Sequence, residues 1–269
     1  MRVAVCTLCI NDWYQEIVKY GVKTIENYAQ RHGYDFYICN EVYDGERDCP
    51  WYKIKAIQKI LPRYDLVFWI DADGHVEKPE QDITHFLGFL GNKDLLCAKD
   101  YNSVLNTGLM VIRNTPFIHA LLDQVWNNKE PFDPAFHEQA SMTQIFEKNR
   151  LGSRNKIEIL PIEKQHILFS YWGEYFPGRS FFLHVARCAH DPVGFVYTLD
   201  LYCPIRMEED LEKEYEDRID WLAKAERCRP DIDQAMAHTI GRTRMSTRCI
   251  LYQQRFLSQK GDKNPQKQN

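Results

Sequence analysis

The sequence lacks most of the features that assign a chain to a class at once. No stretch among its 269 residues approaches the ~20 consecutive apolar residues that a membrane-spanning helix needs. The formal net charge is only −4, with a pI of about 6.2, so composition gives no reason to expect nucleic acid as a partner. The glycine-rich fingerprints of P-loop and Rossmann nucleotide sites are missing too. What remains is an ordinary globular composition, 44% hydrophobic and 27% charged, which excludes collagen-like and disordered chains.

Targeting and disulfide signals are equally sparse. The chain runs from Met1 straight into an apolar segment, without the basic stretch, long apolar run and cleavage site of a secretory leader. Its nine cysteines are odd in number and scattered, which predicts reduced thiols in the core. Cys6 and Cys9 form a lone C-x-x-C pair without the second pair that a zinc site needs. These absences predict a cytoplasmic protein and would suit a viral or microbial source.

Strand-like and helix-like segments alternate through the first two thirds of the chain. Apolar runs of strand length are expected at 2–8, 34–39, 66–70, 94–98, 108–112, 157–160 and 181–186. Apolar residues at helical spacing predict helices at 14–31, 51–61, 116–127 and 137–148. Gly33 is expected to cap the first helix. The alternation predicts an α/β fold with a mostly parallel central sheet flanked by helices, including a Rossmann-like nucleotide-binding half.

The composition changes after the last predicted strand. Residues 206–226 are acidic with helical spacing, residues 227–256 are basic, and residues 258–269 are polar enough to predict disorder. We therefore expect one domain over 1–205, a helical C-terminal extension over 206–257 and a disordered tail. The arginines of the basic part are interleaved with apolar residues, which favours packing on the main domain over peripheral contact with a membrane.

The stretch from Val67 to Asp73 is the most informative part of the sequence. An apolar strand delivers Asp71 and Asp73 to its carboxyl end, where open α/β sheets bind ligands. Two carboxylates so close repel each other and are costly to bury unpaired. A divalent cation would relieve the repulsion, and carboxylate oxygens suit Mg²⁺ or Mn²⁺, which then bridges the phosphates of a nucleotide. A solvated Asp-x-Asp turn is the plainer alternative.

A phosphatase of the haloacid dehalogenase type is a second interpretation of the two aspartates. The pattern of that family resembles Asp-x-Asp-x-Thr/Val, with the first aspartate as the nucleophile. Here His75 occupies the fifth position, and the motif ends the third predicted strand rather than the first. These departures favour the metal site.

Further motifs follow in a fixed order along the chain. They are Trp51-x-Lys53, Asp71-Ala72-Asp73, Asn106-x-Gly108 leading to Ile112-Arg113-Asn114, His137-Glu138-Gln139, Tyr171-Trp172 and His184-x-Ala186-x-Cys188. This string, over roughly residues 1 to 190, resembles the α-glycosyltransferase family of fungi and plants that includes galactosyl-, mannosyl- and xyloglucan xylosyltransferases. It is similar, more distantly, to the glycogenin-like retaining transferases. The resemblance implies a GT-A fold.

The resemblance also implies a metal site. Asp71 would touch the donor ribose and the metal, Asp73 would be a direct ligand, and Ala72 would lie between them in the donor site. His184 would be the third protein ligand, although a histidine ending an apolar strand is otherwise more often part of a core. An imidazole with two carboxylates suits Mn²⁺ well.

Residues of the donor site are implied in the same way. Three residues that end the first strand would line the nucleobase pocket: Val5, Cys6 and Thr7. Lys53 would contact the donor phosphate or sugar, and is otherwise a solvated helix lysine. Asn106 and Gly108 would face the transferred sugar, and otherwise form a turn.

The catalytic residues that the resemblance implies include two departures from the family pattern. Glu138 and Gln139 would lie under the anomeric carbon, on the face away from the leaving group, and Glu138 stands where relatives usually carry aspartate. Arg187 stands where relatives usually carry glycine. It would supply positive charge to the leaving phosphate, or would indicate a different acceptor or lost activity.

The sequence therefore predicts a metal-dependent retaining glycosyltransferase that moves a hexose or pentose from a nucleotide sugar to a glycan hydroxyl. UDP-galactose is the favoured donor, followed by the UDP-linked forms of xylose or glucose. The acceptor is expected to attack from the leaving-group face, with Glu138 or Gln139 stabilising the oxocarbenium-like centre; a covalent Glu138 adduct ranks second. The alternative is a nucleotide-sugar-binding protein that has lost catalysis.

Overall fold

The computed structural model describes residues 1–185 apart from residues 11, 46, 102, 131–135 and 172–179. The predicted C-terminal extension over 206–257, the tail over 258–269 and Arg187 lie outside these residues. None of the helices in the described part has the length and apolarity that a membrane crossing requires.

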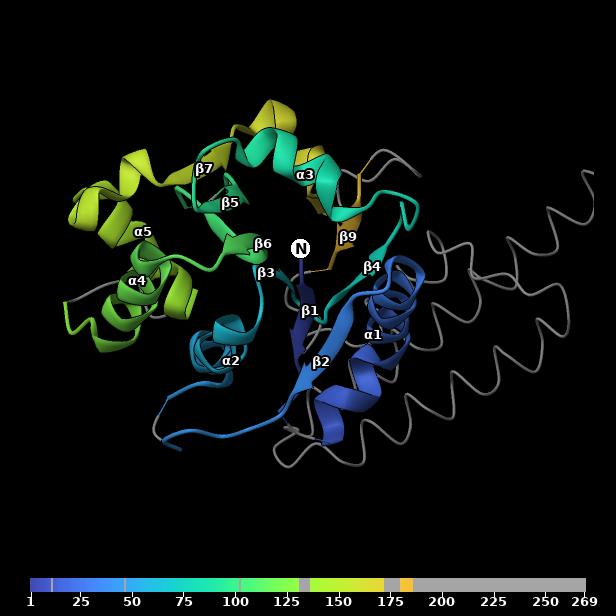
Figure 1. Ribbon diagram of the computed structural model, residues 1–269. Helices are drawn as coiled ribbons and strands as arrows, with labels where there is room; N and C mark the ends of the chain where they lie inside the picture. The colour runs from blue at the N-terminus through green and yellow to red at the C-terminus, as the bar shows by residue number, and fades with distance from the viewer. Residues whose placement is uncertain (11, 46, 102, 131–135, 172–179, 186–269) are drawn as a thin grey trace, which may run out of the picture.

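A six-stranded sheet forms the centre of the described part (Figure 1). Its strands are β1 (Val3–Leu8), β2 (Asp35–Cys39), β3 (Leu66–Ile70), β5 (Leu95–Ala98), β6 (Asn106–Arg113) and β7 (Ile157–Leu160). They lie in the order β2-β1-β3-β6-β5-β7. β1 pairs in parallel with β2 and β3, and β5 pairs in parallel with β7, whereas β6 runs antiparallel to both its neighbours. The predicted α/β fold with a mostly parallel sheet is confirmed.

Helices cover both faces of this sheet. They are α1 (Asp12–His32), α2 (Tyr52–Ile60), α3 (Ile83–Leu90), α4 (Pro116–Asn127) and α5 (His137–Glu147). Short 3-10 helices also occur: η1 (Cys49–Trp51), η2 (Leu61–Arg63), η4 (Arg150–Asn155) and η5 (Ile162–Ile167). Gly33 follows α1 with a φ of +68°, as its predicted capping role requires.

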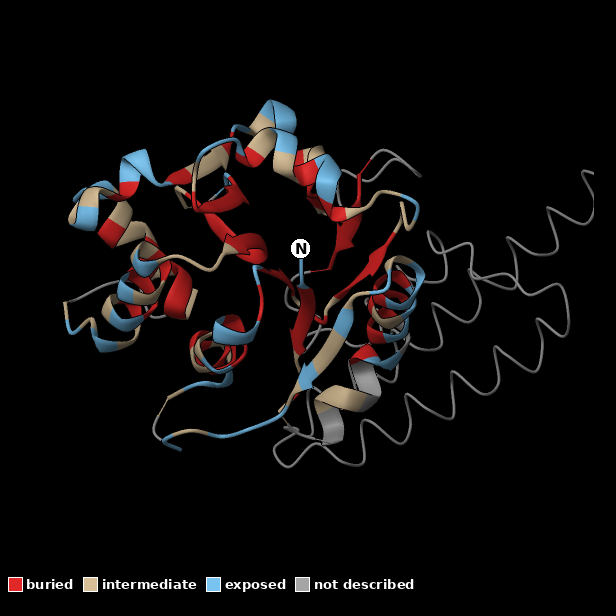
Figure 2. Cartoon of the chain, viewed as in Figure 1, coloured by how far each residue is buried: buried red, intermediate tan, exposed pale blue. Residues whose placement is uncertain are grey.

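Side chains along the strands alternate between two hydrophobic cores, one on each face of the sheet. Ala4 and Cys6 of β1 join the core formed with α2, α4 and α5, whereas Val3 and Val5 join the core formed with α1 and α3. β3, β5 and β6 are buried along nearly their whole length, and β2 at the edge is partly exposed (Figure 2). This burial on both faces explains the continuous apolar runs in the sequence.

A second, three-stranded sheet lies beside the first and was only partly predicted. It contains β4 (Gly74–Val76), β8 (Phe169–Tyr171) and β9 (Phe182–His184), in the order β4-β9-β8. Only β9 was expected from the sequence, as part of a longer strand; β4, β8 and α3 were missed. Strands of three residues are too short to show a periodic pattern. β4 begins directly after Asp73, so this sheet is joined to the end of β3.

Helix α1 packs closely on the turn between β3 and β4. A β-carbon at Gly21 would lie 2.1 Å from the carbonyl oxygen of Gly74 and 3.1 Å from that of Ala72. Both neighbours are backbone atoms, which cannot move without displacing the turn. Glycine at position 21 is therefore what lets α1 support the aspartate turn.

Gly21→Ala is expected to destabilise the protein by about 1–3 kcal/mol, because overpacking at this contact outweighs the better helix propensity of alanine. Gly88→Ala is the matched control, since Gly88 also lies within a helix but its β-carbon would meet nothing within 4 Å. It should leave stability unchanged or raise it by up to about 1 kcal/mol. Urea unfolding measures both. Equal stabilities for the two variants would contradict the proposed contact.

Candidate functional site

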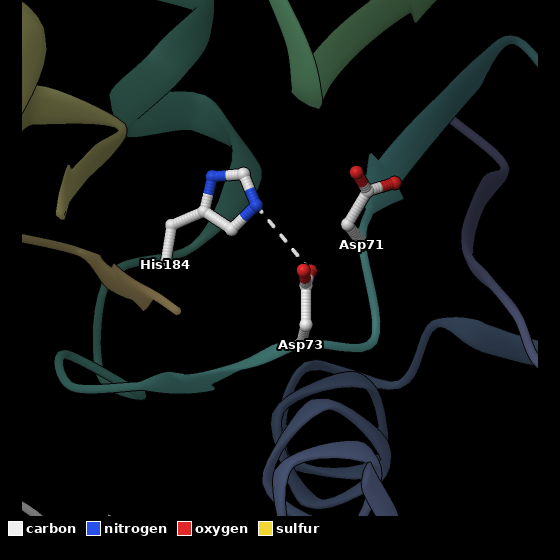
Figure 3. Close-up of side chains that lie close together, drawn as sticks. All are labelled: Asp71, Asp73 and His184. Atoms are coloured by element: carbon white, nitrogen blue, oxygen red, sulfur yellow. Dashed lines mark ion pairs between the residues drawn. The ribbon is translucent and has the colours of Figure 1, made fainter. Parts of the chain in front are cut away.

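Three side chains that can bind a metal come together where the two sheets meet. Asp71 and Asp73 follow β3, and His184 ends β9, where it is the register partner of Gly74 in β4. One ligand atom from each of the three residues lies within 4.8 Å of the others. Figure 3 shows the three side chains around one space, with the dashed line joining His184 Nε2 to Asp73 Oδ1 at 3.3 Å. The backbone pairing of β4 with β9 thus unites residues far apart in the sequence.

The electrostatics of this cluster fit a divalent cation. Burial raises the pKa of the Asp71 carboxyl, and the Asp73 carboxylate adds to the rise, while Lys53 opposes it. Burial alone would lower the pKa of His184, but Asp73 and Asp71 raise it above the usual value. Asp73 Oδ1 is buried and accepts no hydrogen bond of good geometry among the described residues. Two carboxylates and an imidazole are a donor set that suits Mn²⁺.

Lys53 is buried beneath the aspartates. It lies in the first turn of α2, with only 4% of its side chain exposed. Its Nζ is 2.9 Å from Asp71 Oδ1 and 2.9 Å from Glu138 Oε1, and it donates to the Thr107 carbonyl at 3.2 Å. Burial would lower the pKa of Lys53, but the two carboxylates raise it above its ordinary value. The alternative of a solvated helix lysine is therefore wrong.

Glu138 and Gln139 open helix α5 and contact the start of β6. Glu138 is 3% exposed, and its Oε1 accepts a hydrogen bond from Thr107 Oγ1 at 2.9 Å. Gln139 Oε1 accepts from the Thr107 backbone N–H at 3.0 Å, and its Nε2 donates to Asp100 Oδ2 at 3.3 Å. Hydrogen bonds thus hold both side chains close to Thr107, near the candidate metal site.

Asn106 and Gly108 lie in β6 rather than in a turn, so the plainer alternative for them is wrong. Asn106 Oδ1 accepts from the Gly108 backbone N–H at 2.7 Å, and the Gly108 carbonyl accepts from Asp71 N–H at 2.8 Å. A β-carbon at Gly108 would lie 2.6 Å from His184 Cε1. The absence of a side chain at position 108 therefore leaves room for the His184 imidazole.

Asp100 is a buried carboxylate of this site that the sequence analysis missed. Its Oδ2 accepts hydrogen bonds from Asn106 Nδ2 at 2.9 Å, from Tyr171 OH at 2.9 Å and from Gln139 Nε2 at 3.3 Å. A signal was present, because Asp100 follows β5 at the same edge of the sheet where Asp71 follows β3. Asp100 thus connects the amides of the site to one another.

Comparisons with known proteins bear on this arrangement. Residues 25–167, more than half of the chain, match a protein family described as "Protein of unknown function, DUF273". The chain belongs to this family. A stretch of 165 residues is 26% identical to a Schizosaccharomyces pombe protein named as an uncharacterized alpha-1,2-galactosyltransferase, covering 46% of this chain and 44% of that one. The match thus spans less than half the length of this curated relative.

A solved structure confirms the fold of this DUF273 protein. The crystal structure of a glycosyltransferase involved in the glycosylation of the major capsid of PBCV-1 is similar with a TM-score of 0.60 and 16% identity. The similarity covers 75% of this chain and 100% of that one. The GT-A-type fold that the sequence resemblance implied is confirmed.

The DUF273 segment holds most of the residues of the site. Lys53, Asp71, Asp73, Glu138 and Gln139 lie inside it, and His184 lies beyond it.

The predicted donor-site residues of β1 lie beside β3, where Val5 and Cys6 are the register partners of Phe68 and Trp69. Val5 and Cys6 are fully buried in the two hydrophobic cores, and their contact with a nucleobase stays a prediction. Thr7 is buried with an Oγ1 that makes no hydrogen bond among the described residues, and Ala72 is buried in the aspartate turn.

Proposed function

We propose that this DUF273 protein is a metal-dependent glycosyltransferase that moves a sugar from a nucleoside diphosphate sugar to a glycan hydroxyl with retention of anomeric configuration, releasing the nucleoside diphosphate. The observation that carries the proposal is the convergence of Asp71, Asp73 and His184 at the carboxyl edge of a GT-A-type sheet. Asp71, Asp73 and His184 would hold Mn²⁺ or Mg²⁺, which stabilises negative charge developing on a departing diphosphate.

UDP-galactose is the donor that we favour, followed by the UDP-linked forms of xylose or glucose. The name of the Schizosaccharomyces pombe relative, an alpha-1,2-galactosyltransferase, supports galactose. Galactose is α-linked in its UDP donor, so an α-linked product corresponds to net retention. The acceptor would be a glycan hydroxyl.

The buried polar groups support a role for Glu138 and Gln139 at the reacting centre. Glu138 Oε1 receives both the Lys53 ammonium and the Thr107 hydroxyl, each at 2.9 Å. A carboxylate oxygen held by two strong donors is a weak nucleophile, so we propose that Glu138 stabilises positive charge on the sugar without forming a covalent bond. Gln139, fixed by Thr107 and Asp100, would orient the sugar. The proton of the acceptor hydroxyl would pass to an oxygen of the leaving diphosphate.

A donor titration tests the proposal. The full chain is titrated with UDP, GDP and a panel of UDP-sugars, with and without Mn²⁺, and the midpoint of thermal unfolding is followed together with donor hydrolysis and transfer to galactoside and mannoside acceptors. Saturation at about one hundred times the Kd should stabilise the protein by about 2.7 kcal/mol. We expect this stabilisation with UDP and UDP-galactose only when Mn²⁺ is present, with slow hydrolysis of UDP-galactose.

Other outcomes of the titration would each contradict a part of the proposal. Metal-dependent binding of UDP-sugars without hydrolysis or transfer would indicate a binding protein that has lost catalysis. In a separate assay with an aryl phosphate, hydrolysis with a trappable Asp71 adduct would indicate the phosphatase. No response to Mn²⁺ or to any nucleotide would overturn the assignment of the metal site.

A further inference from the structure

The imidazole of His184 is enclosed by aromatic rings and by a glycine. Tyr171 is the register partner of His184 across the parallel strands β8 and β9, and the two rings stack with centroids 5.5 Å apart at 23°. The ring of Phe169 meets the imidazole edge-on, with centroids 5.4 Å apart at 86°. Gly108 lies against Cε1. These contacts leave Nε2 directed toward Asp73 (Figure 3).

The second ring nitrogen of His184 lacks the contact that usually orients a metal-binding histidine. Such histidines generally donate their other N–H to a carboxylate, a backbone carbonyl or water, and this bond sets the plane of the ring. Nδ1 of His184 is buried and has no hydrogen-bond partner among the described residues. Within the described residues, packing on the ring faces is therefore what sets the imidazole plane.

Tyr171 is itself held at its far end. Its hydroxyl donates to Asp100 Oδ2 at 2.9 Å and accepts from Asn106 Nδ2 at 2.9 Å. Asp100 is bonded in turn to Gln139, so a continuous chain of contacts runs from the predicted sugar-facing amides to the imidazole. A phenol ring anchored in this way cannot slide or tilt without breaking buried hydrogen bonds to a charged group.

We propose that Tyr171, anchored by Asp100, is a positioning residue that holds the His184 imidazole in the plane required to bind a divalent cation together with Asp71 and Asp73. The proposal rests on the proposed function, because it concerns the same metal site. The torsion of a histidine ring about its last bond is broad and roughly two-fold, whereas a metal site needs its ligands within about 10–20° of the productive geometry. Stacking against Tyr171 restricts the rotation of the imidazole ring, which the torsion about its last bond leaves free.

The test measures Mn²⁺ affinity directly, by electron paramagnetic resonance of free Mn²⁺ in a titration of the full chain without donor. Tyr171→Leu removes the stack and should weaken Mn²⁺ binding about 10–100-fold, the range found when groups that orient a metal ligand are lost. Tyr171→Phe keeps the stack and loses only the anchor, so it should restore most of the affinity and stay within about tenfold of the wild type. Tyr37→Phe is the matched control, because its hydroxyl bonds only to Tyr64 in the edge region of the sheet. It should bind Mn²⁺ like the wild type.

Thermal unfolding of each variant without metal separates loss of orientation from loss of fold. If Tyr171→Leu does not fold, the Mn²⁺ affinity of Tyr171→Phe is used as the test instead. This variant should bind Mn²⁺ about three- to tenfold more weakly than the wild type. A folded Tyr171→Leu protein, or failing that Tyr171→Phe, with wild-type Mn²⁺ affinity would overturn the positioning role while leaving the metal site intact. A wild-type protein that binds no Mn²⁺ would overturn the proposed function instead.

Discussion

Asp73→Asn is expected to remove the Mn²⁺-dependent rise in unfolding temperature and to lower sugar transfer about a hundredfold or more. The change replaces a charged ligand by a neutral one in a cluster where only Asp71 and His184 would remain. A bound metal contributes several kcal/mol to stabilising charge in the transition state, and each 1.4 kcal/mol corresponds to tenfold in rate. The loss should appear both in Mn²⁺ titrations and in transfer assays.

The fold of the Asp73→Asn protein should survive. Asp73 is joined to the second sheet through its backbone, because its carbonyl accepts the N–H of Val185 at 2.8 Å. Asp123→Asn is the control, since Asp123 is exposed and its carboxylate accepts a hydrogen bond from the Gln58 side chain, which the oxygen of an asparagine can also accept. The control should match the wild type in Mn²⁺ response and transfer. Full transfer activity of Asp73→Asn with Mn²⁺ would show that the metal site has been misassigned.

Lys53→Met is expected to destabilise the protein by about 3–5 kcal/mol, the cost of breaking a buried ion pair by removing one partner. The methionine keeps the unbranched stem but leaves the carboxylates of Asp71 and Glu138 without their shared cation. Such a loss is a large part of the 5–15 kcal/mol that holds a typical domain folded. Urea unfolding at fixed temperature measures it. Transfer activity should fall as well, because both carboxylates lose their positions.

Two further variants separate charge from packing at this position. Lys59→Met is the control on the same helix: Lys59 is exposed and pairs with Glu41 at the surface, so we expect a change of about 1 kcal/mol or less. Lys53→Met combined with Glu138→Gln should be more stable than Lys53→Met alone, because Glu138 is the more deeply buried of the two carboxylates. A double variant less stable than Lys53→Met would mean that the unpaired charge of Glu138 does not decide the cost.

The balance of charge in the site gives these two predictions a common origin. Four carboxylates lie in this site, those of Asp71, Asp73, Asp100 and Glu138, and the Lys53 ammonium pairs with two of them. Lys53 pairs with Asp71 and Glu138, and Asp100 accepts hydrogen bonds from two amides and a phenol. Among the described residues, the Asp73 carboxylate has His184 Nε2 at 3.3 Å as its partner. Asp73 is therefore the carboxylate at which an added cation would relieve the most repulsion.

The sequence by itself determined the class of fold and the place of the two aspartates. The apolar run of β3 has no polar break, which is typical of a strand buried on both faces, and the change to Asp71 and Asp73 marks its carboxyl end. The alternation of strands and helices then predicted the α/β arrangement. The spacing of apolar residues within a segment indicates which of its faces are buried. That spacing was enough to predict the strands of the central sheet.

Only the tertiary structure decided which side chains meet. It reversed the direction of β6, placed the short strands β4 and β8 around β9, and so brought His184 to the aspartates. It also buried Lys53 between Asp71 and Glu138, and tied Tyr171 to Asp100. Contacts between residues so distant in the chain depend on the packing of whole helices and strands. The sequence pattern within one segment does not indicate which residues of another segment it will contact.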